Sequence, residues 1–478
     1  MGNKRGILMH ISSLPSAYGI GDFGREAFEF VDFLKSAGQS FWQILPQNPT
    51  GFGDSPYQSA SAFAGNPYFI DIDALCQEGL LKREEIDSYF FGKDPEKVDY
   101  EKLFFYRYPL LRSAFLRFEA NDKYQEFIEK NSDWLEEYAL FMALKEKNHY
   151  NSWVCWDNDL KKRDKNALDG CRKELKKTID FYKFVQFKFF EQWYKLKEYA
   201  NSRGIQIIGD MPIYVSMDSS EVWSERELFQ IDENDCPKAV AGYAPDDEYK
   251  SGQLWGNPLY SWEEMKKQGY KWWIRRIKQA EEMYDMVRID HFCGFFDYYS
   301  VEPAAHDARC GVFKKAPGEE LFEVITSVSD IKIIAENPGR ISKRADNAME
   351  KYGFYGMNIL EHSLDFKNVL WNRLPGSVYY TSTHDTDTIR GWYESLSKNK
   401  QSVTRKVFSV KRGENPAEAI IKYLLLDCSD IAIVPIQDYL GLGSKARMNI
   451  PSTLGGNWLF RVKKEDITQA LAKYIKEI

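Results

Sequence analysis

Eight short apolar runs recur along the chain, and each of them ends in polar residues. Continuous apolar runs of this length are typical of strands that are covered on both faces, as the strands of a parallel sheet are. We therefore predict eight parallel strands. The runs occupy residues 6–12, 41–47, 205–211, 286–292, 331–337, 355–362, 378–385 and 431–437.

Helical patterns lie between many of these runs. Residues 261–285 begin with Ser261 and Glu264 at the spacing of a capping box, which predicts one helix from that point. Residues 415–428 begin with an asparagine as the cap and a proline in the first helical position. Helices that alternate with eight parallel strands predict a (β/α)8 barrel. A further helix over 24–38 is expected to face the core through Ala27, Phe28, Val31, Phe33 and Leu34.

The spacing between the predicted strands is uneven. The stretches 48–204 and 212–285 are longer than a simple helical crossover, so we expect them to form inserted subdomains above one mouth of the barrel. The first stretch also contains the second barrel helix. About 40 residues follow the last strand, enough for a loop and a closing helix, and no C-terminal β-domain is expected. The prediction for residues 1–478 is thus a single barrel domain with two insertions.

Charge and composition narrow the classes of partner. The net charge of -7 comes from 64 basic and 71 acidic residues, and neither sign forms a long block. We therefore expect neither nucleic acid nor an anionic membrane surface as a partner, and no feature indicates an obligate protein partner. No apolar run approaches the roughly 18 residues of a membrane span. The seven cysteines are scattered without a CxxC pair, which favours reduced thiols and a cytoplasmic location.

Aromatic residues make up 15% of the chain. A large core would account for many of them. A cleft for sugars would account for others, because the C–H faces of sugar rings stack on aromatic rings. Composition leaves both interpretations open.

Polar residues stand at the ends of the predicted strands, where barrel enzymes carry the active site. Four of the six histidines of the chain are among them, which favours a functional site at this mouth of the barrel. The residues at the strand ends are His10, Gln47, Asp210, Asp290, His291, Glu336, Asn337, His362, His384 and Asp385.

The fourth run, MVRIDHF, places Arg288 and Asp290 two positions apart, so a strand would point both side chains into the barrel. The guanidinium should keep Asp290 ionised, although the two residues could also form a purely structural ion pair. Glu336 follows an apolar run, and burial should raise its pKa and keep it protonated. One ionised and one protonated carboxyl are what a retaining glycosidase needs. Asp385 adds a carboxylate that could grip substrate hydroxyls, cap the next helix, or do both.

Two other motifs carry less weight. Residues 19–24, GIGDFG, match a dinucleotide-binding pattern, but Pro15 separates them from the preceding strand and the second run ends in Gln47 instead of an acid. We therefore expect no nucleotide cofactor. The histidines show neither HxxxH nor HExxH spacing, so no catalytic metal is expected either.

Seven blocks of the sequence closely resemble the signature blocks of the 4-alpha-glucanotransferases, also called amylomaltases or disproportionating enzymes, of glycoside hydrolase family 77. The resemblance runs in order from residue 6 to about residue 460. It implies a (β/α)8 barrel with inserted subdomains and transfer of an α-1,4-glucan segment to the 4-hydroxyl of an acceptor, with α-1,4-glucans and maltooligosaccharides as ligands. The blocks are SPYQSxSAFAGNPYFI (55–70), GDMPIYV (209–215), GQLWGNPLY (252–260), RIDHFCGF (288–295), IIAENPG (333–339), STHDTDT (382–388) and GGNW (455–458).

The resemblance also implies roles for individual residues. It implies that Asp290 is the nucleophile, Glu336 the acid and base, and Asp385 the stabiliser of the transition state. It further implies a mobile lid around 245–252, for which an ordinary solvated loop is the alternative. The residues implied to bind the sugar are Arg288, His291, His384, Asp210, Tyr57, Trp255 and Asn457.

Two other functions stay open at this stage. A hydrolase would use the same three carboxylates and differ only in taking water as the acceptor. A glucan-binding protein built on an inactive barrel would not need all three carboxylates, so the intact set argues against it.

Overall fold

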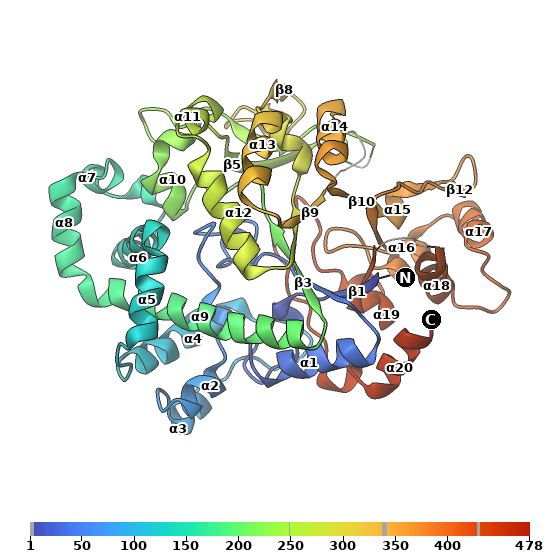
Figure 1. Ribbon diagram of the computed structural model, residues 1–478, viewed down its shortest axis with the longest axis horizontal. Helices are drawn as coiled ribbons and strands as arrows, with labels where there is room; N and C mark the ends of the chain where they lie inside the picture. The colour runs from blue at the N-terminus through green and yellow to red at the C-terminus, as the bar shows by residue number, and fades with distance from the viewer. Residues whose placement is uncertain (1–3, 248, 337–341, 428–430) are drawn as a thin grey trace.

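The computed structural model describes residues 4–247, 249–336, 342–427 and 431–478. Its centre is a closed barrel of eight parallel strands in the order β1-β14-β13-β10-β9-β6-β3-β2, of which Figure 1 labels β1, β3, β9 and β10. The predicted barrel and its eight strands are confirmed, and each strand is shorter than its apolar run. The strands are β1 (Lys4–Leu8), β2 (Phe41–Gln43), β3 (Gln206–Met211), β6 (Met286–Ile289), β9 (Lys332–Ala335), β10 (Tyr355–Ile359), β13 (Ser377–Tyr380) and β14 (Ile431–Pro435).

Burial on both faces explains why the strands read as continuous apolar runs. Every residue of β6, β13 and β14 is buried. The interior of the barrel leaves little room, since a Cβ atom at Gly6 would lie 2.5 Å from Cδ1 of Ile433 and 2.6 Å from Cβ of Phe41. Glycine at this position therefore allows β1 to pack against its neighbours.

The first insertion forms eight α-helices between β2 and β3, and most of them extend to one side of the barrel in Figure 1. The longest of them, α9, packs on α6 and also on α1 and β3, so it serves as the barrel helix of this crossover. The helices are α2 (Ile72–Gln77), α3 (Arg83–Asp87), α4 (Tyr100–Phe115), α5 (Asp122–Lys130), α6 (Ser132–Lys147), α7 (Asn158–Lys161), α8 (Lys165–Glu174) and α9 (Lys176–Ser202).

The second insertion contributes to a sheet that the sequence analysis did not predict. Its strands β4 (Val240–Tyr243) and β5 (Gln253–Pro258) pair with each other, and β4 pairs with β7 (Asp297–Val301), which pairs with β8 (Val312–Lys315). The resulting antiparallel sheet, β5-β4-β7-β8, joins the insertion to the segment that follows β6. Its strands have four to six residues each and lack the long apolar runs of the barrel.

The single helix predicted from Ser261 is wrong in extent. The chain forms α11 (Trp262–Lys267) and α12 (Lys271–Met283), and the side chain of Ser261 makes no capping hydrogen bond. Between them, Gly269 and Tyr270 adopt left-handed conformations with φ of 65° and 55°. Glycine takes this conformation without steric cost, so it ends α11 and turns the chain into α12.

Two other predicted helices are present. In α18 (Pro416–Asp427), the side chain of Asn415 accepts a hydrogen bond from the N–H of Ala417 at 3.0 Å, which confirms the predicted cap. Cys428, the last residue of that prediction, lies outside the described residues. In α1 (Arg25–Ser36), Phe30 is buried and Phe28 only partly so, and the rest of the predicted face is as expected.

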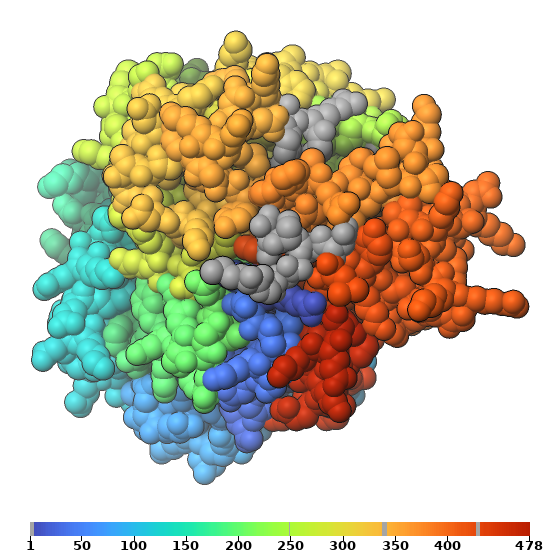
Figure 2. Space-filling view, turned by 45° about the vertical axis from the view of Figure 1, so that its right-hand side comes forward, coloured from blue at the N-terminus to red at the C-terminus, as the bar shows by residue number. Residues whose placement is uncertain are grey.

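The remaining elements complete the outer layer. α20 packs on α1, so the end of the chain lies beside its beginning, as the red and blue segments show in Figure 2. Among the described residues, no helix is both long and apolar enough to cross a membrane. These elements are α10 (Ser220–Ser224), α13 (Gly318–Val328), α14 (Lys343–Tyr352), α15 (Leu360–Ser363), β11 (Leu364–Asp365), β12 (Leu370–Trp371), α16 (Ile389–Ser395), α17 (Lys398–Val407), α19 (Ile436–Tyr439) and α20 (Gln469–Glu477).

Candidate active site

A buried arginine lies at the centre of the candidate site. Asp210 on β3 and Arg288 on β6 are register partners on adjacent strands. Nη1 of Arg288 donates to both carboxylate oxygens of Asp210, at 2.7 and 2.8 Å. The side chains are 2% and 0% exposed. Both contacts come from the one nitrogen Nη1, and this buried charged pair holds that side of the guanidinium against Asp210.

The same guanidinium holds two further carboxylates. Asp290 follows β6 and Glu336 follows β9, and Nη2 of Arg288 lies 3.3 Å from Oδ1 of Asp290 and 2.7 Å from Oε1 of Glu336. Because both contacts share Nη2, these two oxygens lie no more than about 6 Å apart, which suits the close carboxyl pair of a retaining glycosidase. Their side chains are 25% and 22% exposed, so a ligand can reach them.

Asp385 lies on the loop between β13 and α16. Its Oδ1 accepts a hydrogen bond from Nδ2 of Asn449 at 2.7 Å, and its Oδ2 lies 3.3 Å from Nε2 of His384. The cap of α16 is Thr388, whose hydroxyl accepts from the N–H of Gly391. The alternative that Asp385 caps this helix is therefore excluded, and its carboxylate is held at the site.

Tyr57 brings the first insertion into the site. Its hydroxyl donates to Oδ2 of Asp210 at 2.7 Å and lies 2.9 Å from Nε2 of His384. The rings of Tyr57 and His384 are stacked, with centroids 5.4 Å apart. Trp458, which the sequence analysis did not single out, lies 5.6 Å from Tyr57 and 6.0 Å from His384, centroid to centroid. These rings form an aromatic wall beside Asp210.

His291 and Trp255 form a second wall. The backbone of His291 is left-handed, with φ of 48°, and its N–H donates to Oε2 of Glu336 at 2.8 Å. Its ring packs edge-on against Trp255 of β5 at 4.8 Å. A non-glycine residue in this conformation is uncommon, and such residues cluster at functional sites. The strained turn aims the His291 N–H at the carboxylate of Glu336.

The other sequence-based candidates have separate surroundings. The amide of Asn457 is bonded within its own loop, to the backbone N–H of Ile450 and to both oxygens of Thr453. Nδ1 of His10 accepts from the N–H of Leu45. His362 lies on α15 with an exposed side chain, Gln47 is buried, and Asn337 lies outside the described residues.

The charges of Asp290 and Glu336 differ from the sequence-based expectation. Burial, and then the negative charge of Glu336, raise the pKa of Asp290 well above its usual range. Burial also favours the neutral form of Glu336, but the charge of Arg288 and the N–H of His291 outweigh it and lower the pKa of Glu336. The prediction of an ionised Asp290 beside a protonated Glu336 is therefore wrong for this structure. The prediction failed because Arg288 lies closer to Glu336 than to Asp290 and therefore favours the charge on Glu336.

Two buried histidines, His291 of the site and His10 outside it, are neutral. Burial, and then the charge of His384, lower the pKa of His10 to about 3. Burial lowers the pKa of His291 to about 4. Both imidazoles are therefore uncharged near neutral pH and can accept or donate a hydrogen bond. Among the described residues, no group of three or more His, Cys, Asp or Glu side chains is placed to hold a metal ion.

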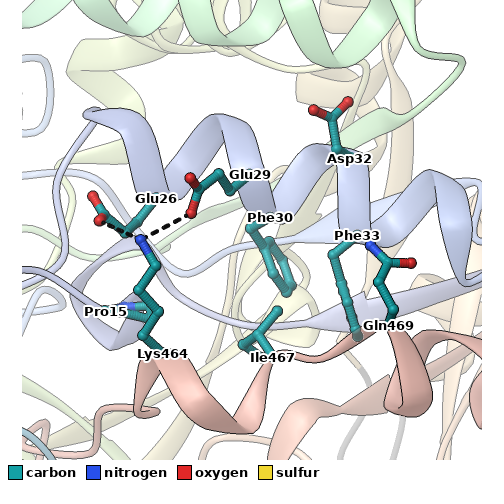
Figure 3. Close-up of a pocket in the computed structure, with 9 residues that line it drawn as sticks. All are labelled: Pro15, Glu26, Glu29, Phe30, Asp32, Phe33, Lys464, Ile467 and Gln469. Atoms are coloured by element: carbon teal, nitrogen blue, oxygen red, sulfur yellow. Dashed lines mark hydrogen bonds and ion pairs between the residues drawn. The ribbon is translucent and has the colours of Figure 1, made fainter.

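A separate cavity of about 300 Å³ lies between α1 and the segment before α20 (Figure 3). Lys464 bridges Glu26 and Glu29 at 3.2 Å each across it, and Phe30 and Ile467 are among its apolar lining. No residue of the candidate active site lines this cavity.

The fold and the site together define the class of enzyme to which the protein belongs. A (β/α)8 barrel with a close carboxyl pair and a third carboxylate at the carboxyl ends of its strands is a retaining enzyme that acts on glycosidic bonds.

The comparisons with known proteins specify the family. The sequence profile of 4-alpha-glucanotransferase, glycoside hydrolase family 77, matches residues 9–468. The 4-alpha-glucanotransferase of Clostridium butyricum is 43% identical over 476 residues, which cover 98% of each chain. The chain therefore belongs to the 4-alpha-glucanotransferases of family 77, which transfer glucan segments with retention of configuration.

Solved structures agree with this assignment. The amylomaltase from Streptococcus agalactiae, determined in complex with acarbose, superposes with a TM-score of 0.95 and is 42% identical, over 99% of this chain and 98% of that chain. The amylomaltase from Corynebacterium glutamicum has a TM-score of 0.74 at 17% identity, over 100% of this chain and 74% of that chain. At that identity the second comparison supports the fold alone.

Proposed function

We propose that Asp290, Glu336 and Asp385 carry the glucanotransferase reaction, with Asp290 as the nucleophile and Glu336 as the acid and base. The observation that supports these roles is the contact of one buried nitrogen, Nη2 of Arg288, with both Asp290 and Glu336. The contact keeps the two carboxyls close enough for a double displacement, and the local charge retains one proton on the pair.

In the first step, Glu336 donates a proton to the glycosidic oxygen while Asp290 attacks the anomeric carbon. The bond from carbon to the leaving oxygen breaks, and a glucosyl ester forms on Asp290. Before a glucan binds, the raised pKa of Asp290 favours the shared proton on Asp290. This proton must pass to Glu336 when a glucan occupies the site. Departure of that proton from Asp290 also generates the anionic nucleophile, so one transfer within the pair prepares both groups.

In the second step, the 4-hydroxyl of an acceptor sugar attacks the same carbon and Glu336 takes its proton. The ester to Asp290 breaks, and two inversions give net retention. Asp385 is held ionised, because His384, Asn449 and Arg288 outweigh the effect of burial and lower its pKa. Its charge can therefore stabilise the positive character that develops on the sugar ring in both steps.

The remaining site residues are proposed to bind the sugar at the cleavage point. Tyr57 offers a ring surface for stacking, and Asp210, His291, His384 and Trp255 surround the carboxyl pair. The partners proposed are α-1,4-glucans and maltooligosaccharides. For Asn457 we propose an indirect contribution through the loop that precedes Trp458.

We also propose the domain limits 48–204 and 212–285 for the two insertions, since these stretches separate consecutive barrel strands. A cytoplasmic location is proposed on the basis of the cysteines. Six described cysteines are free thiols, which suits a reducing compartment.

Maltotriose tests the assigned roles. The native chain is expected to convert it to glucose and to chains longer than the substrate. Asp290→Asn is expected to lower that rate by at least about 10³-fold, since the nucleophile is lost. The matched control is Asp297→Asn, because Asp297 on β7 is similarly exposed, at 30%, and faces Arg344 instead of the site. Chromatography of the product chains measures both. Substantial transfer by Asp290→Asn, or an equal loss in the control, would refute the assignment.

A further inference from the structure

A buried carboxylate holds both ends of the loop that carries His384 and Asp385. Asp438 on α19 is 2% exposed. Its Oδ2 accepts hydrogen bonds from the hydroxyls of Thr381 and Ser382, at 2.6 and 2.7 Å, where the chain leaves β13. Its Oδ1 accepts from the backbone N–H of Ile389 at 2.8 Å, where α16 begins.

These bonds satisfy groups that would otherwise be buried without partners. Thr381 and Ser382 are 0% and 2% exposed, and Ile389 is 1% exposed. A buried donor without a partner destabilises the fold, because it has lost its hydrogen bond to water and gained none in return. Burial itself opposes the charge and raises the pKa of Asp438 to about 6. The carboxylate thus remains ionised at neutral pH because three donors surround it.

The segment after α19 holds the middle of the same loop. The N–H of Asn449 donates to the carbonyl of His384 at 3.0 Å, and its side chain donates to Asp385. The hydroxyl of Ser444 donates to Oδ2 of Asp387 at 2.6 Å. The loop is therefore fixed at both ends by Asp438 and at its middle by residues that follow it in the chain.

We infer that Asp438 is a positioning residue for the reaction, which sets the place of Asp385 by fixing the ends of the 381–389 loop. This inference rests on the role proposed above for Asp385. Asp438 itself does not touch the Asp290–Glu336 pair through any of its three bonds. A group that acts only on the transition state changes kcat more than KM, and a displacement of about 1 Å can cost about 10²-fold.

Asp438→Asn tests the inference, because it keeps the shape of the side chain but replaces one acceptor oxygen with a donor. We expect kcat for maltotriose transfer to fall about 10²-fold while KM changes less than about threefold. The matched control is Asp22→Asn. Asp22 is also buried, accepts bonds from Ser16 and Gly24, and has a pKa raised to about 7 by burial and by Asp71. Its loss should lower thermal stability and leave kcat unchanged.

A double variant with Asp385→Asn distinguishes a positioning role of Asp438 from a general loss of structure. In an Asp385→Asn background, Asp438→Asn should lower kcat by less than about threefold, since its effect passes through the missing carboxylate. A full further loss in that background would overturn the inference. So would an unchanged kcat in Asp438→Asn alone. An Asp385→Asn variant with normal activity would instead refute the proposed role of Asp385.

If Asp438→Asn does not fold, Ser382→Ala decides the question. This change removes one of the two hydroxyl donors at the β13 end and leaves the carboxylate in place. We expect kcat to fall about tenfold with KM nearly unchanged, because only the bond from Thr381 then holds that end of the loop. An unchanged kcat in a folded Ser382→Ala variant would overturn the inference.

Discussion

Asp290 and Asp385 have opposite electrostatic surroundings although they belong to the same site. The pKa of Asp290 is raised by burial and by Glu336, and the pKa of Asp385 is lowered by neighbours that outweigh burial. An unfolded aspartate titrates near pH 3.9. From about pH 4 upward, Asp290 therefore makes the folded state progressively less stable, whereas Asp385 stabilises it and loses that contribution as the pH falls.

Thermal unfolding of the variants Asp290→Asn and Asp385→Asn checks whether each carboxylate stabilises or destabilises the folded state. Relative to the native chain, the melting temperature of Asp290→Asn should rise between about pH 4 and pH 8, because a destabilising charge is absent. Asp385→Asn should be less stable than the native chain by a constant amount over that range, and its deficit should shrink only as the pH falls below about 4. If the two variants follow the same trend with pH, the charges assigned to the site are incorrect.

Glu336 is expected to protonate the leaving group. Glu336→Gln should slow cleavage of maltotriose by about 10²–10⁴-fold, the usual contribution of a general acid. The same variant should be affected far less with an α-glucosyl fluoride, whose leaving group needs no proton. Initial rates with the two donors make the comparison within one variant. Equal losses with both donors would show that Glu336 is not the acid.

At the scale of elements, the long apolar runs predicted the barrel strands, because strands covered on both faces leave a clear pattern. The antiparallel sheet β5-β4-β7-β8 left no such pattern, since β8 is exposed along its whole length. The break between α11 and α12 was also missed, although Gly269 carried the signal for it. A glycine inside an amphipathic pattern can be tolerated or can end a helix, and the sequence alone does not decide between them.

β5 brings Trp255 from the second insertion to the ring of His291. If Trp255 shields the glucosyl ester from water, Trp255→Ala should reduce transfer more than ester formation, and the ratio of new reducing ends to transferred chains should rise. Leu254→Ala is the matched control, because Leu254 is 37% exposed and neighbouring strand residues point to opposite faces.

Maltotriose products from the two variants give this ratio. A slower Trp255→Ala enzyme with an unchanged ratio would mean that Trp255 serves donor binding alone. The predicted lid around 245–252 includes Glu248, which lies outside the described residues, so the test is confined to β5.

At the scale of the whole molecule, the site is assembled from distant parts of the chain. The alternation of apolar runs and polar ends predicted the strand-end residues around Arg288, because parallel strands bring their carboxyl ends together. Tyr57 came only from the family resemblance, since its partner Asp210 is 153 positions away. The predicted protonation states of Asp290 and Glu336 were wrong, because they depend on which of the two carboxylates Arg288 contacts more closely. The contributions of Asn449 and Asp438 were not predicted, because both residues bond the 381–389 loop, which is distant from them in the sequence.

The central claim is that glucan transfer passes through an ester on Asp290, and trapping that ester tests it most directly. A fluorinated α-glucosyl fluoride should label the Glu336→Gln variant, because the fluorine and the missing base both slow the second step. Trypsin cleaves after Arg288 and Arg309, so the label is expected on the peptide 289–309, and fragmentation should place it on Asp290. A label on any other residue, or release of fluoride with retention and no labelled peptide, would contradict the account.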